Sequence, residues 1–181
     1  MSRSETFEVL QVESELAQMV ALYRERKPAR VLEIGSWDGG TMRVWLTEAA
    51  PYAKIAAVDL NHRNSDAYEE WRRDDTELTW LVADSQTDHA RAWILENGPF
   101  DWMFVDGDHG YAAVKSDVDA CVAAAAPGAV ILLHDITPPA GDPTYPPGVL
   151  LDEYAAAGFK TDRYQDLTPA TWARGIGVIY L

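Results

Sequence analysis

Cysteine and basic residues are scarce in this 181-residue chain. The single cysteine, Cys121, falls in a segment with helical apolar spacing, so no disulfide can form within the chain and we expect a buried thiol. Fifteen Lys and Arg residues stand against 29 Asp and Glu residues, which gives a net charge of −14, and there is no basic run. An acidic surface repels phosphate backbones, so the composition disfavours a nucleic-acid partner.

Long apolar runs are also missing. No stretch is long enough to span a bilayer, and the start, Met1 to Thr6, leads into amphipathic rather than continuous apolar sequence. We therefore expect no membrane partner, no signal peptide and a cytoplasmic protein. With 181 residues, 48% of them hydrophobic, the chain is long enough for one domain with a substantial core and too short for two ordinary ones.

The sequence does contain a regular alternation of short apolar segments and helix-like segments. An amphipathic pattern over 5–27 predicts an N-terminal helix that Pro28 closes, and the pattern over 110–126 predicts a helix that Pro127-Gly128 ends. The early apolar segments are hydrophobic on both faces, as parallel strands covered by helices must be. Expected strands cover 29–35, 54–60, 78–83, 100–106, 129–135, 159–165 and 175–181, and further expected helices cover 40–49, 65–73, 87–97 and 148–157.

The segment 31–40 is typical of a strand, a glycine turn and the start of a helix, which together open many nucleotide-binding α/β domains. A dinucleotide site needs a second glycine in this turn, so that the backbone can approach the pyrophosphate, and Trp37 stands in that place. A nucleoside ligand without phosphates, such as S-adenosylmethionine, tolerates the change. The segment resembles motif I of class I S-adenosylmethionine-dependent methyltransferases, with Glu33, Gly35 and Gly39 on the family's pattern and Trp37 departing from it.

The two last expected strands also fit this resemblance. They are joined without a crossover helix and must therefore pair antiparallel. We expect one methyltransferase domain over 1–181, with an N-terminal helix in 1–28 and a Rossmann-like core in 29–181. Its fold class is α/β: a doubly wound, mostly parallel sheet with a reversed last strand and helices on both faces. Residues 137–148, with five prolines and two glycines, are expected to form an irregular loop.

Acidic residues follow the expected strands, where ligands bind in an open α/β sheet. Asp59 lies at about the distance from Gly35 that is expected of a ribose-binding acid, and its carboxylate could accept both ribose hydroxyls. It could instead cap the next turn, a role also open to Asn61. The resemblance implies that Asp84 and Ser85 meet the adenine, with Asp84 accepting from its amino group, although the pair could also form a helix N-cap.

The resemblance implies further contacts with the cofactor. Trp37 is expected beside it, where an aromatic face can attract the sulfonium cation. The expected cofactor-binding residues are Glu33, Gly35, Ser36, Trp37, Gly39, Asp59, Asp84, Ser85 and Asp106.

The densest group of chemically active residues comes after the fourth expected strand, where Asp106, Asp108 and His109 fall within four positions. Buried carboxylates are costly unless they are paired or metal-bound, so such a group favours function over structure alone. The Asp-Gly-Asp-His run resembles a subfamily of small methyltransferases related to cephalosporin-biosynthesis proteins and to sugar and natural-product O-methyltransferases. It is also similar to the metal-dependent catechol and caffeoyl-coenzyme A O-methyltransferases. That similarity implies a metal ligand at Asp106 and a general base at His109.

The fifth strand end supplies His134 and Asp135, which fall where those relatives carry two further ligands. Asp106, His134 and Asp135 are thus the expected ligands of a divalent metal, and the imidazole suits Mn or Zn better than Mg. The alternative is that His134 hydrogen-bonds Asp106 and no metal binds.

His109 and Asp106 are the expected catalytic residues. Asp106 and Asp108 are expected to raise the pKa of His109 and to orient its ring, although His109 could also cap the following helix. His62 and His89 lie in polar sequence and are expected at the surface. Tyr145 and Trp172 could line an acceptor pocket or anchor loops.

These features predict an S-adenosylmethionine-dependent methyltransferase that acts on a hydroxyl of a small molecule, such as a sugar or natural product, with metal assistance left open. A nucleotide-dependent oxidoreductase lacks support because the second glycine is missing. A metal-dependent hydrolase explains the acidic cluster but not Gly35 and Asp59. A non-catalytic nucleoside-binding domain also stays open. The expected partner is a small-molecule acceptor, and a homodimer is compatible with the sequence.

Overall fold

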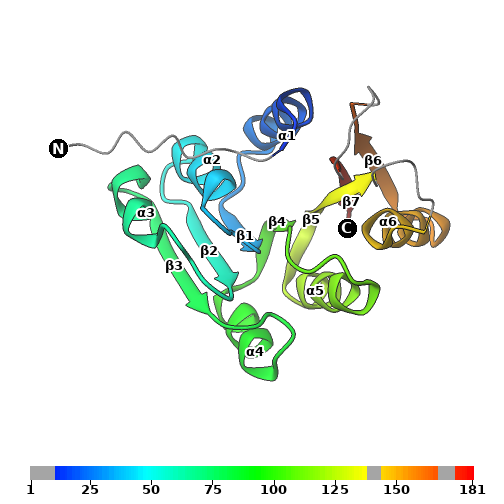
Figure 1. The fold of residues 1–181 in the computed structure, drawn as a ribbon. Helices are drawn as coiled ribbons and strands as arrows, with labels where there is room; N and C mark the ends of the chain where they lie inside the picture. Colours follow the sequence, from blue (N-terminus) through cyan, green and yellow to red (C-terminus); the bar gives the residue numbers. More distant parts are fainter. Residues whose placement is uncertain (1–10, 138–143, 167–173) are drawn as a thin grey trace.

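The computed structural model describes residues 11–137, 144–166 and 174–181 (Figure 1). In this described part the chain forms helices α1 (Glu13–Arg26), α2 (Gly40–Glu48), α3 (Ser65–Trp71), α4 (Asp88–Asn97), α5 (Tyr111–Ala123) and α6 (Pro146–Ala156). The strands are β1 (Arg30–Ile34), β2 (Lys54–Asp59), β3 (Glu77–Val82), β4 (Phe100–Val105), β5 (Ala125–Thr137), β6 (Lys160–Tyr164) and β7 (Arg174–Tyr180).

The strands build one sheet in the order β3-β2-β1-β4-β5-β7-β6. The neighbours among β1 to β5 pair in parallel, whereas β7 runs antiparallel to both β5 and β6. The predicted α/β fold with a reversed last strand is confirmed. The strand order changes direction between β1 and β4, and ligands bind at such a switch point in open α/β sheets.

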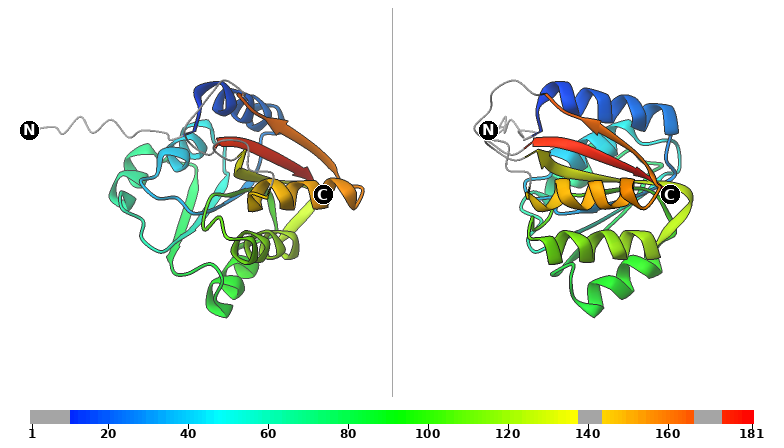
Figure 2. Two further views of the ribbon diagram at one scale, coloured as in Figure 1. Left: turned by 45° about the vertical axis from the view of Figure 1, so that its right-hand side comes forward. Right: turned by 90° about the vertical axis from the view of Figure 1, so that its right-hand side faces the viewer.

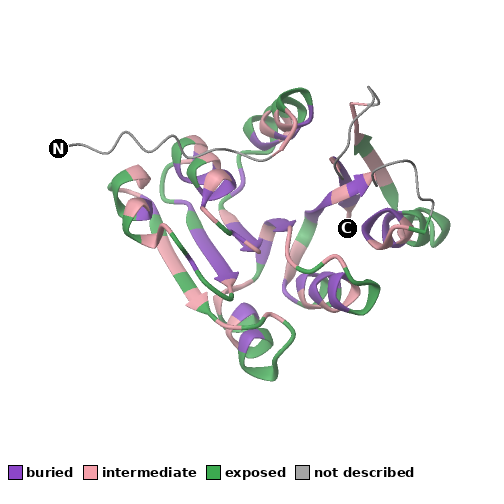
Figure 3. Ribbon diagram, in the orientation of Figure 1, coloured by how far each residue is buried: buried purple, intermediate pink, exposed green. Residues whose placement is uncertain are grey.

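Helices cover both faces of the sheet, as the two views of Figure 2 show. Helices α1, α2 and α3 pack on one face around Trp45 and Trp102, and α4, α5 and α6 pack on the other. Successive β1 residues alternate between the two cores, Val31 facing the first and Leu32 the second. Figure 3 shows the result: the central strands are buried, and the edge strands β3 and β6 are more exposed.

Several helix boundaries differ from the sequence prediction, and three of them have a clear reason or position. Helix α1 begins at Glu13 rather than near residue 5, and 5–10 lie outside the described residues. Helix α5 ends at Ala123, before Pro127-Gly128, because the Ala124 carbonyl already accepts a hydrogen bond from the Phe100 amide of β4 (2.8 Å). Helix α6 begins at Pro146, since proline fits the first turn of a helix, where no backbone donor is needed.

Two further features are the single cysteine and the length of the helices. Cys121 is a buried free thiol, as expected. Each helix in the described ranges is too short or too polar to cross a membrane.

Candidate functional site

The glycine turn after β1 is packed against the end of β4. Gly35 has a φ of +85°, and a Cβ there would lie 2.2 Å from the Asp106 carbonyl oxygen. Gly39 has a φ of +83° and is the N-cap of α2, and a Cβ there would lie 2.7 Å from the Tyr68 ring. Both positions require glycine, because another residue would clash and would also be strained.

Glu33 lies beneath this turn and is completely buried. Its carboxylate accepts hydrogen bonds from the Thr41 hydroxyl (2.6 Å) and from the Trp45 indole N–H. Burial raises its pKa to about 8, against the lowering effect of these two bonds. The predicted cofactor contact is therefore corrected: Glu33 joins β1 to α2 from the core side.

Asp59, at the end of β2, holds the turn from the other side. Its Oδ2 accepts the backbone amides of Ser36 (2.7 Å) and Trp37 (2.9 Å), and its Oδ1 accepts the Asn61 amide (2.7 Å). A carboxylate offers about four acceptor positions, of which three are occupied here. Asp59 therefore caps this turn, which was the alternative role, and one acceptor position of its carboxylate stays open towards the cavity.

His62 ties the same turn to β3. Its Nε2 lies 2.9 Å from the Leu81 carbonyl oxygen, so that nitrogen carries the proton, and Nδ1 accepts the Ser36 hydroxyl at 2.9 Å. His62 is only 6% exposed, so the predicted surface position is wrong. Its two partners, Ser36 and Leu81, are distant in sequence, and no local sequence pattern predicts these contacts. His89 is exposed, as predicted.

A cavity of about 500 Å³ opens at the carboxyl ends of β1 to β4. Six of the predicted cofactor-binding residues line it, and Glu33, Ser36 and Gly39 do not. Ser36 instead lines a smaller hollow of about 40 Å³ that shares Gly35, Trp37 and Asp106 with the large cavity. The predicted residues in the large cavity are Gly35, Trp37, Asp59, Asp84, Ser85 and Asp106.

Asp84 is exposed on the rim of this cavity, and its Oδ1 accepts a hydrogen bond from the backbone amide of Gln86 at 2.9 Å. The N-cap of α4 is Thr87, whose hydroxyl accepts the Ala90 amide at 3.2 Å. The alternative of an Asp84-Ser85 N-cap is therefore wrong, and both residues remain available to the cavity.

Trp37 stands on the cavity wall with a φ of 45° and 53% of its surface exposed. The Arg63 guanidinium lies 3.6 Å from the centroid of its ring and 3.7 Å from the Asp38 carboxylate. One face of the indole, which was expected to meet the sulfonium, is thus occupied by a cation from the chain itself.

The ends of β4 and β5 bring together Asp106, His134 and Asp135, whose ligating atoms lie within 4.8 Å of one another. His134 Nδ1 donates to Asp106 Oδ1 at 3.0 Å and lies 3.4 Å from Asp135 Oδ1. Burial lowers the pKa of His134, but the two carboxylates raise it to about 9. Burial raises the pKa of Asp106, but His134 and His109 hold it below its ordinary value.

His109 reaches this cluster from the loop after β4. Its Nε2 lies 3.4 Å from Asp135 Oδ2 and 3.8 Å from Asp106 Oδ1, and its Nδ1 is hydrogen-bonded to the Tyr145 hydroxyl at 3.1 Å. The nearby Asp106 carboxylate raises its pKa more than burial lowers it, and Asp135 adds to the rise. Asp108, predicted to orient the ring, instead accepts the Gly110 amide at 2.7 Å.

The other predicted roles near this cluster have clear outcomes. The N-cap of α5 is Gly110 without a side-chain bond, so His109 is no cap. Tyr145 is part of the site through His109, and Trp172 lies outside the described residues. No sequence pattern indicated Gln11, whose side-chain amide donates to Asp106 Oδ2 at 3.1 Å.

Three buried polar atoms of this cluster have no hydrogen-bond partner among the described residues: His109 Nε2, His134 Nε2 and Asp135 Oδ1. Asp135 also has a φ of 57°, an unusual backbone conformation for a residue with a side chain. Unsatisfied groups and backbone strain of this kind concentrate at functional sites. Two carboxylates and an imidazole form a donor set that suits a divalent transition metal.

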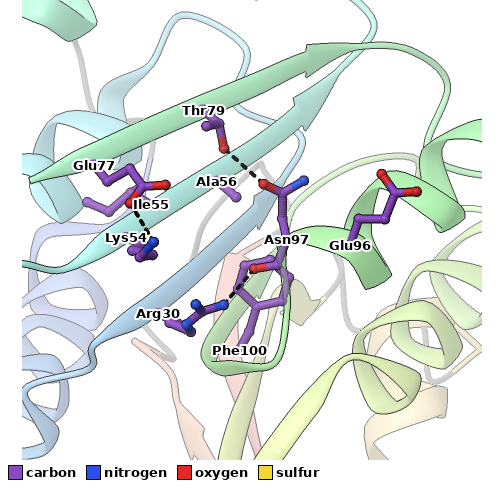
Figure 4. A pocket seen from close by; sticks show the side chains of 9 residues that line it. All are labelled: Arg30, Lys54, Ile55, Ala56, Glu77, Thr79, Glu96, Asn97 and Phe100. Carbon is purple, nitrogen blue, oxygen red and sulfur yellow. Dashed lines mark hydrogen bonds and ion pairs between the residues drawn. The ribbon is translucent and has the colours of Figure 1, made fainter.

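A second cavity, of about 120 Å³, lies at the opposite, amino-terminal ends of β1 and β2 (Figure 4). Its two cationic side chains are already engaged. Lys54 pairs with Glu77, and the Arg30 guanidinium donates to the carbonyls of Asn97 (3.0 Å) and Gly98 (2.7 Å). The candidate functional residues therefore lie at the carboxyl ends of the strands.

Residues 32–136, more than half of the chain, match a family model described as a methyltransferase domain. The chain belongs to this family, which confirms the predicted class of protein. No curated protein matches the chain.

Solved structures agree on the fold. An O-methyltransferase from Bacillus cereus, in complex with S-adenosylhomocysteine, is 16% identical with a TM-score of 0.69, and the match covers 97% of this chain and 84% of that one. The O-methyltransferase TomG from Streptomyces achromogenes, in complex with S-adenosylmethionine, is 18% identical with a TM-score of 0.66 and coverages of 95% and 82%. MycE of the mycinamycin pathway, in complex with Mg, S-adenosylhomocysteine and mycinamycin VI, is 20% identical with a TM-score of 0.63, over 90% of this chain and 48% of that one.

Proposed function

We propose that this protein is an S-adenosylmethionine-dependent methyltransferase that acts on a hydroxyl group of a small molecule. The observation that carries the proposal is that one cavity holds six predicted cofactor residues and shares Asp106 with the cluster of Asp106, His134 and Asp135. A volume of about 500 Å³ lies in the range usual for small-molecule sites. Membership in a methyltransferase family accounts for the cavity and the cluster together, whereas the hydrolase alternative accounts for the cluster alone.

In this proposal the cavity holds the nucleoside part of the cofactor. Asp59 accepts one ribose hydroxyl with its remaining acceptor position, and Gly35 lets the backbone approach the ligand without a side chain in the way. Structurally similar methyltransferases were solved with S-adenosylmethionine or S-adenosylhomocysteine, which supports the choice of ligand.

Asp106, His134 and Asp135 would hold a divalent metal. In the structure His134 bridges the two carboxylates through Nδ1, and a cation can replace that positive charge. A bound ion would supply Lewis acidity that lowers the pKa of the acceptor hydroxyl. MycE was solved with Mg, whereas the imidazole in this set favours Mn or Zn.

His109 is the proposed general base. Its hydrogen bond to Tyr145 orients the ring and leaves Nε2, which has no hydrogen-bond partner among the described residues, to take the acceptor proton. Asp135 and Asp106 lie beside Nε2 and stabilise the protonated ring. The chain then contributes positioning and proton transfer, which methyl transfer between bound groups requires.

The acceptor is proposed to be a small, neutral or cationic molecule, because the net charge of −14 disfavours polyanions. Sugar and phenol hydroxyls both fit a site built around a carboxylate cluster and a base.

Calorimetry tests the proposal directly. We expect the purified protein to bind S-adenosylhomocysteine and to ignore NAD, and a protein that binds NAD alone would end the methyltransferase proposal. Elemental analysis after metal-free purification, followed by addition of Mn²⁺, Zn²⁺ or Mg²⁺, tests the metal. Methyl transfer that is unchanged by chelators would show that the cluster works as a hydrogen-bond network.

A further inference from the structure

Strand β3 lies at one edge of the sheet, and β2 is its one neighbour among the described strands (Figure 1). The Glu77 amide donates to the Ala53 carbonyl of the β2 side (2.9 Å), and the Ala83 amide donates to the Asp59 carbonyl (3.0 Å). Along an edge strand, alternate residues direct their backbone groups to the neighbouring strand and to the open side. Every second residue between Glu77 and Ala83 therefore presents its N–H and C=O groups to the open edge.

The residues with outward backbone groups are Leu78, Trp80 and Val82, which are all apolar. Their side chains share the face of the sheet that α3 covers, because side chains alternate along a strand. Leu78 packs on the core of that face, and the Trp80 ring lies edge-on to the Tyr68 ring at 5.9 Å. Trp80 is 36% exposed and Val82 is 63% exposed. An edge strand with open backbone groups and exposed apolar side chains can pair with a strand of another chain.

The opposite edge of the sheet is protected by charge. Strand β6 lies there, and three of its five residues are Lys160, Asp162 and Arg163. Charged side chains on an edge strand oppose pairing with another chain. In β3 the one charged residue is Glu77, at the start of the strand, and it forms an ion pair with Lys54 of β2. The sequence of β3 thus lacks the protection that β6 has.

We propose that β3 is an interface with a second copy of this chain, in which the two β3 strands pair antiparallel about a twofold axis at Trp80. The two Trp80 residues then exchange both backbone hydrogen bonds, and Leu78 of each copy does the same with Val82 of the other. A twofold interface needs a surface that is complementary to itself, and β3 meets that condition in this register. The inference goes beyond the proposed function and does not depend on it.

The register follows from the positions of the apolar residues. A twofold axis at Thr79 would set Val82 opposite Thr76, and an axis at Leu81 would set Leu78 opposite Asp84, outside the strand in both cases. The axis at Trp80 instead pairs the three outward residues with one another. It also brings their side chains together on one face, where apolar and aromatic cross-strand pairs stabilise a sheet.

The net charge predicts how this interface responds to salt. Two copies of a chain with a charge of −14 repel each other, whereas the paired residues of β3 carry no charge. Salt screens the repulsion and leaves the apolar contacts and backbone bonds in place. Association should therefore become stronger with added salt, and an interface held by ion pairs would become weaker.

Disulfide cross-linking tests the register. The single cysteine of the chain, Cys121, is buried and does not compete. Trp80→Cys places thiols on residues that face each other with Cα atoms about 5.5 Å apart, a distance that a disulfide bridges. We expect this variant to form a covalent dimer under mild oxidation. Val82→Cys is the control, because its two copies would lie about 13 Å apart along the strands and should stay unlinked.

Sedimentation velocity of the full chain measures the association itself. We expect a monomer–dimer equilibrium whose dimer fraction grows with protein concentration up to roughly 0.1 mM. Val82→Lys places a charge on the edge and should raise the dissociation constant at least about tenfold. Val122→Lys makes the same replacement at an exposed position of α5 and should leave that constant within about twofold of the wild-type value.

Val82→Pro tests the backbone bonds separately. The Val82 N–H faces away from β2, so proline should leave the sheet intact and remove a donor of the interface. We expect it to weaken the dimer while thermal unfolding stays close to that of the wild-type protein. A wild-type protein that remains monomeric at roughly 0.1 mM overturns the inference. So does a dimer that Val82→Lys leaves intact, or one that Val82→Cys cross-links as readily as Trp80→Cys.

Discussion

The ends of β1 and β2 and the ends of β4 and β5 lie at the same edge of the sheet, but their polar groups are bonded differently. At the first pair of strands, the carboxylates of Glu33 and Asp59 and the ring of His62 all have hydrogen-bond partners within the chain. At the second pair, His109 and Asp135 each keep a buried atom that has no partner in the described part of the chain.

This difference indicates that the two regions have different roles. The β1–β2 region shapes the glycine turn before any ligand arrives, so its bonds serve the cavity as a scaffold. The β4–β5 region is left incomplete, and incomplete bonding in a buried site is tolerated where a ligand, an ion or a proton completes it. Changes in the first region should therefore act on stability and cofactor affinity, and changes in the second on the chemical step.

The largest effect is expected in the β4–β5 region. His109→Ala should lower turnover by roughly 10²–10⁴-fold, the usual contribution of a general base, with the affinity for S-adenosylhomocysteine nearly unchanged. Turnover of the wild-type protein should rise with pH through a pKa above 6.5, because only the neutral ring accepts a proton and the nearby Asp106 and Asp135 carboxylates favour the charged form. Rates can be measured with a hydroxyl acceptor found by screening sugars and phenols. His89→Ala, at an exposed position, is the control, and full turnover in His109→Ala would assign the proton to another group.

Glu33 gives the matching experiment in the β1–β2 region. Glu33→Ala leaves the Trp45 N–H and the Thr41 hydroxyl unpaired in the core, so the free energy of unfolding should fall by about 2–5 kcal/mol. Glu33→Gln keeps an acceptor for Trp45 and should cost far less. Urea unfolding measures both, and a scaffold role requires this order.

The pH dependence of stability adds a second readout for Glu33. Its pKa is about 8 in the folded protein against 4.5 for the ordinary group, so folding binds a proton that the unfolded chain releases. The stability from this group is therefore complete below pH 4.5 and is lost as the pH rises towards 8. Glu33→Gln should lack this loss, which would appear as a smaller difference between urea midpoints at about pH 5 and about pH 8.

Asp59 joins the scaffold to the cofactor, and an intermediate effect is expected there. Asp59→Ala removes the acceptor of the Ser36 and Trp37 amides and one proposed partner of the ribose. The affinity for S-adenosylhomocysteine should fall by about 1.5–3 kcal/mol, which is roughly 10-fold to 150-fold in the dissociation constant. Asp66→Ala, exposed at the start of α3, is the calorimetric control. An unchanged affinity in Asp59→Ala would restrict Asp59 to the turn.

The sequence was sufficient to predict the sheet, because the central parallel strands carry apolar side chains on both faces and end in, or are followed by, glycine or acidic residues. It also predicted which strand ends converge, and hence the contact between Asp106 and His134. Contacts between residues that are distant in sequence could not be predicted. His62 is buried by Ser36 and Leu81, which are distant in sequence, although its neighbours are polar.

Asp117 is a different case, because its signal was present in the sequence. It occupies the apolar face of a helix between Val114 and Cys121, where a charge is out of place. The pattern could show that this charge is unusual, but not that its carboxylate lies beside Gly107 in the loop after β4. The helix end was misjudged for a related reason: Pro127-Gly128 is a strong stop signal, yet pairing of Ala125 with Phe100 of β4 ends the helix earlier.

The smallest expected effect concerns the cation on the Trp37 ring. Arg63 lies over one face of the indole at 3.6 Å and lines the same cavity, so it competes there with a sulfonium. Arg63→Ala frees that face and removes a positive charge. Binding of cationic S-adenosylmethionine should therefore improve relative to neutral S-adenosylhomocysteine by about 0.5–1 kcal/mol, or roughly 2-fold to 5-fold. Arg43→Ala, which removes the cation near Trp71 (5.8 Å) away from the cavity, should leave this ratio unchanged. If Arg63→Ala changes the affinities for both ligands equally, the sulfonium does not meet the indole, and Trp37 belongs wholly to the scaffold of the turn.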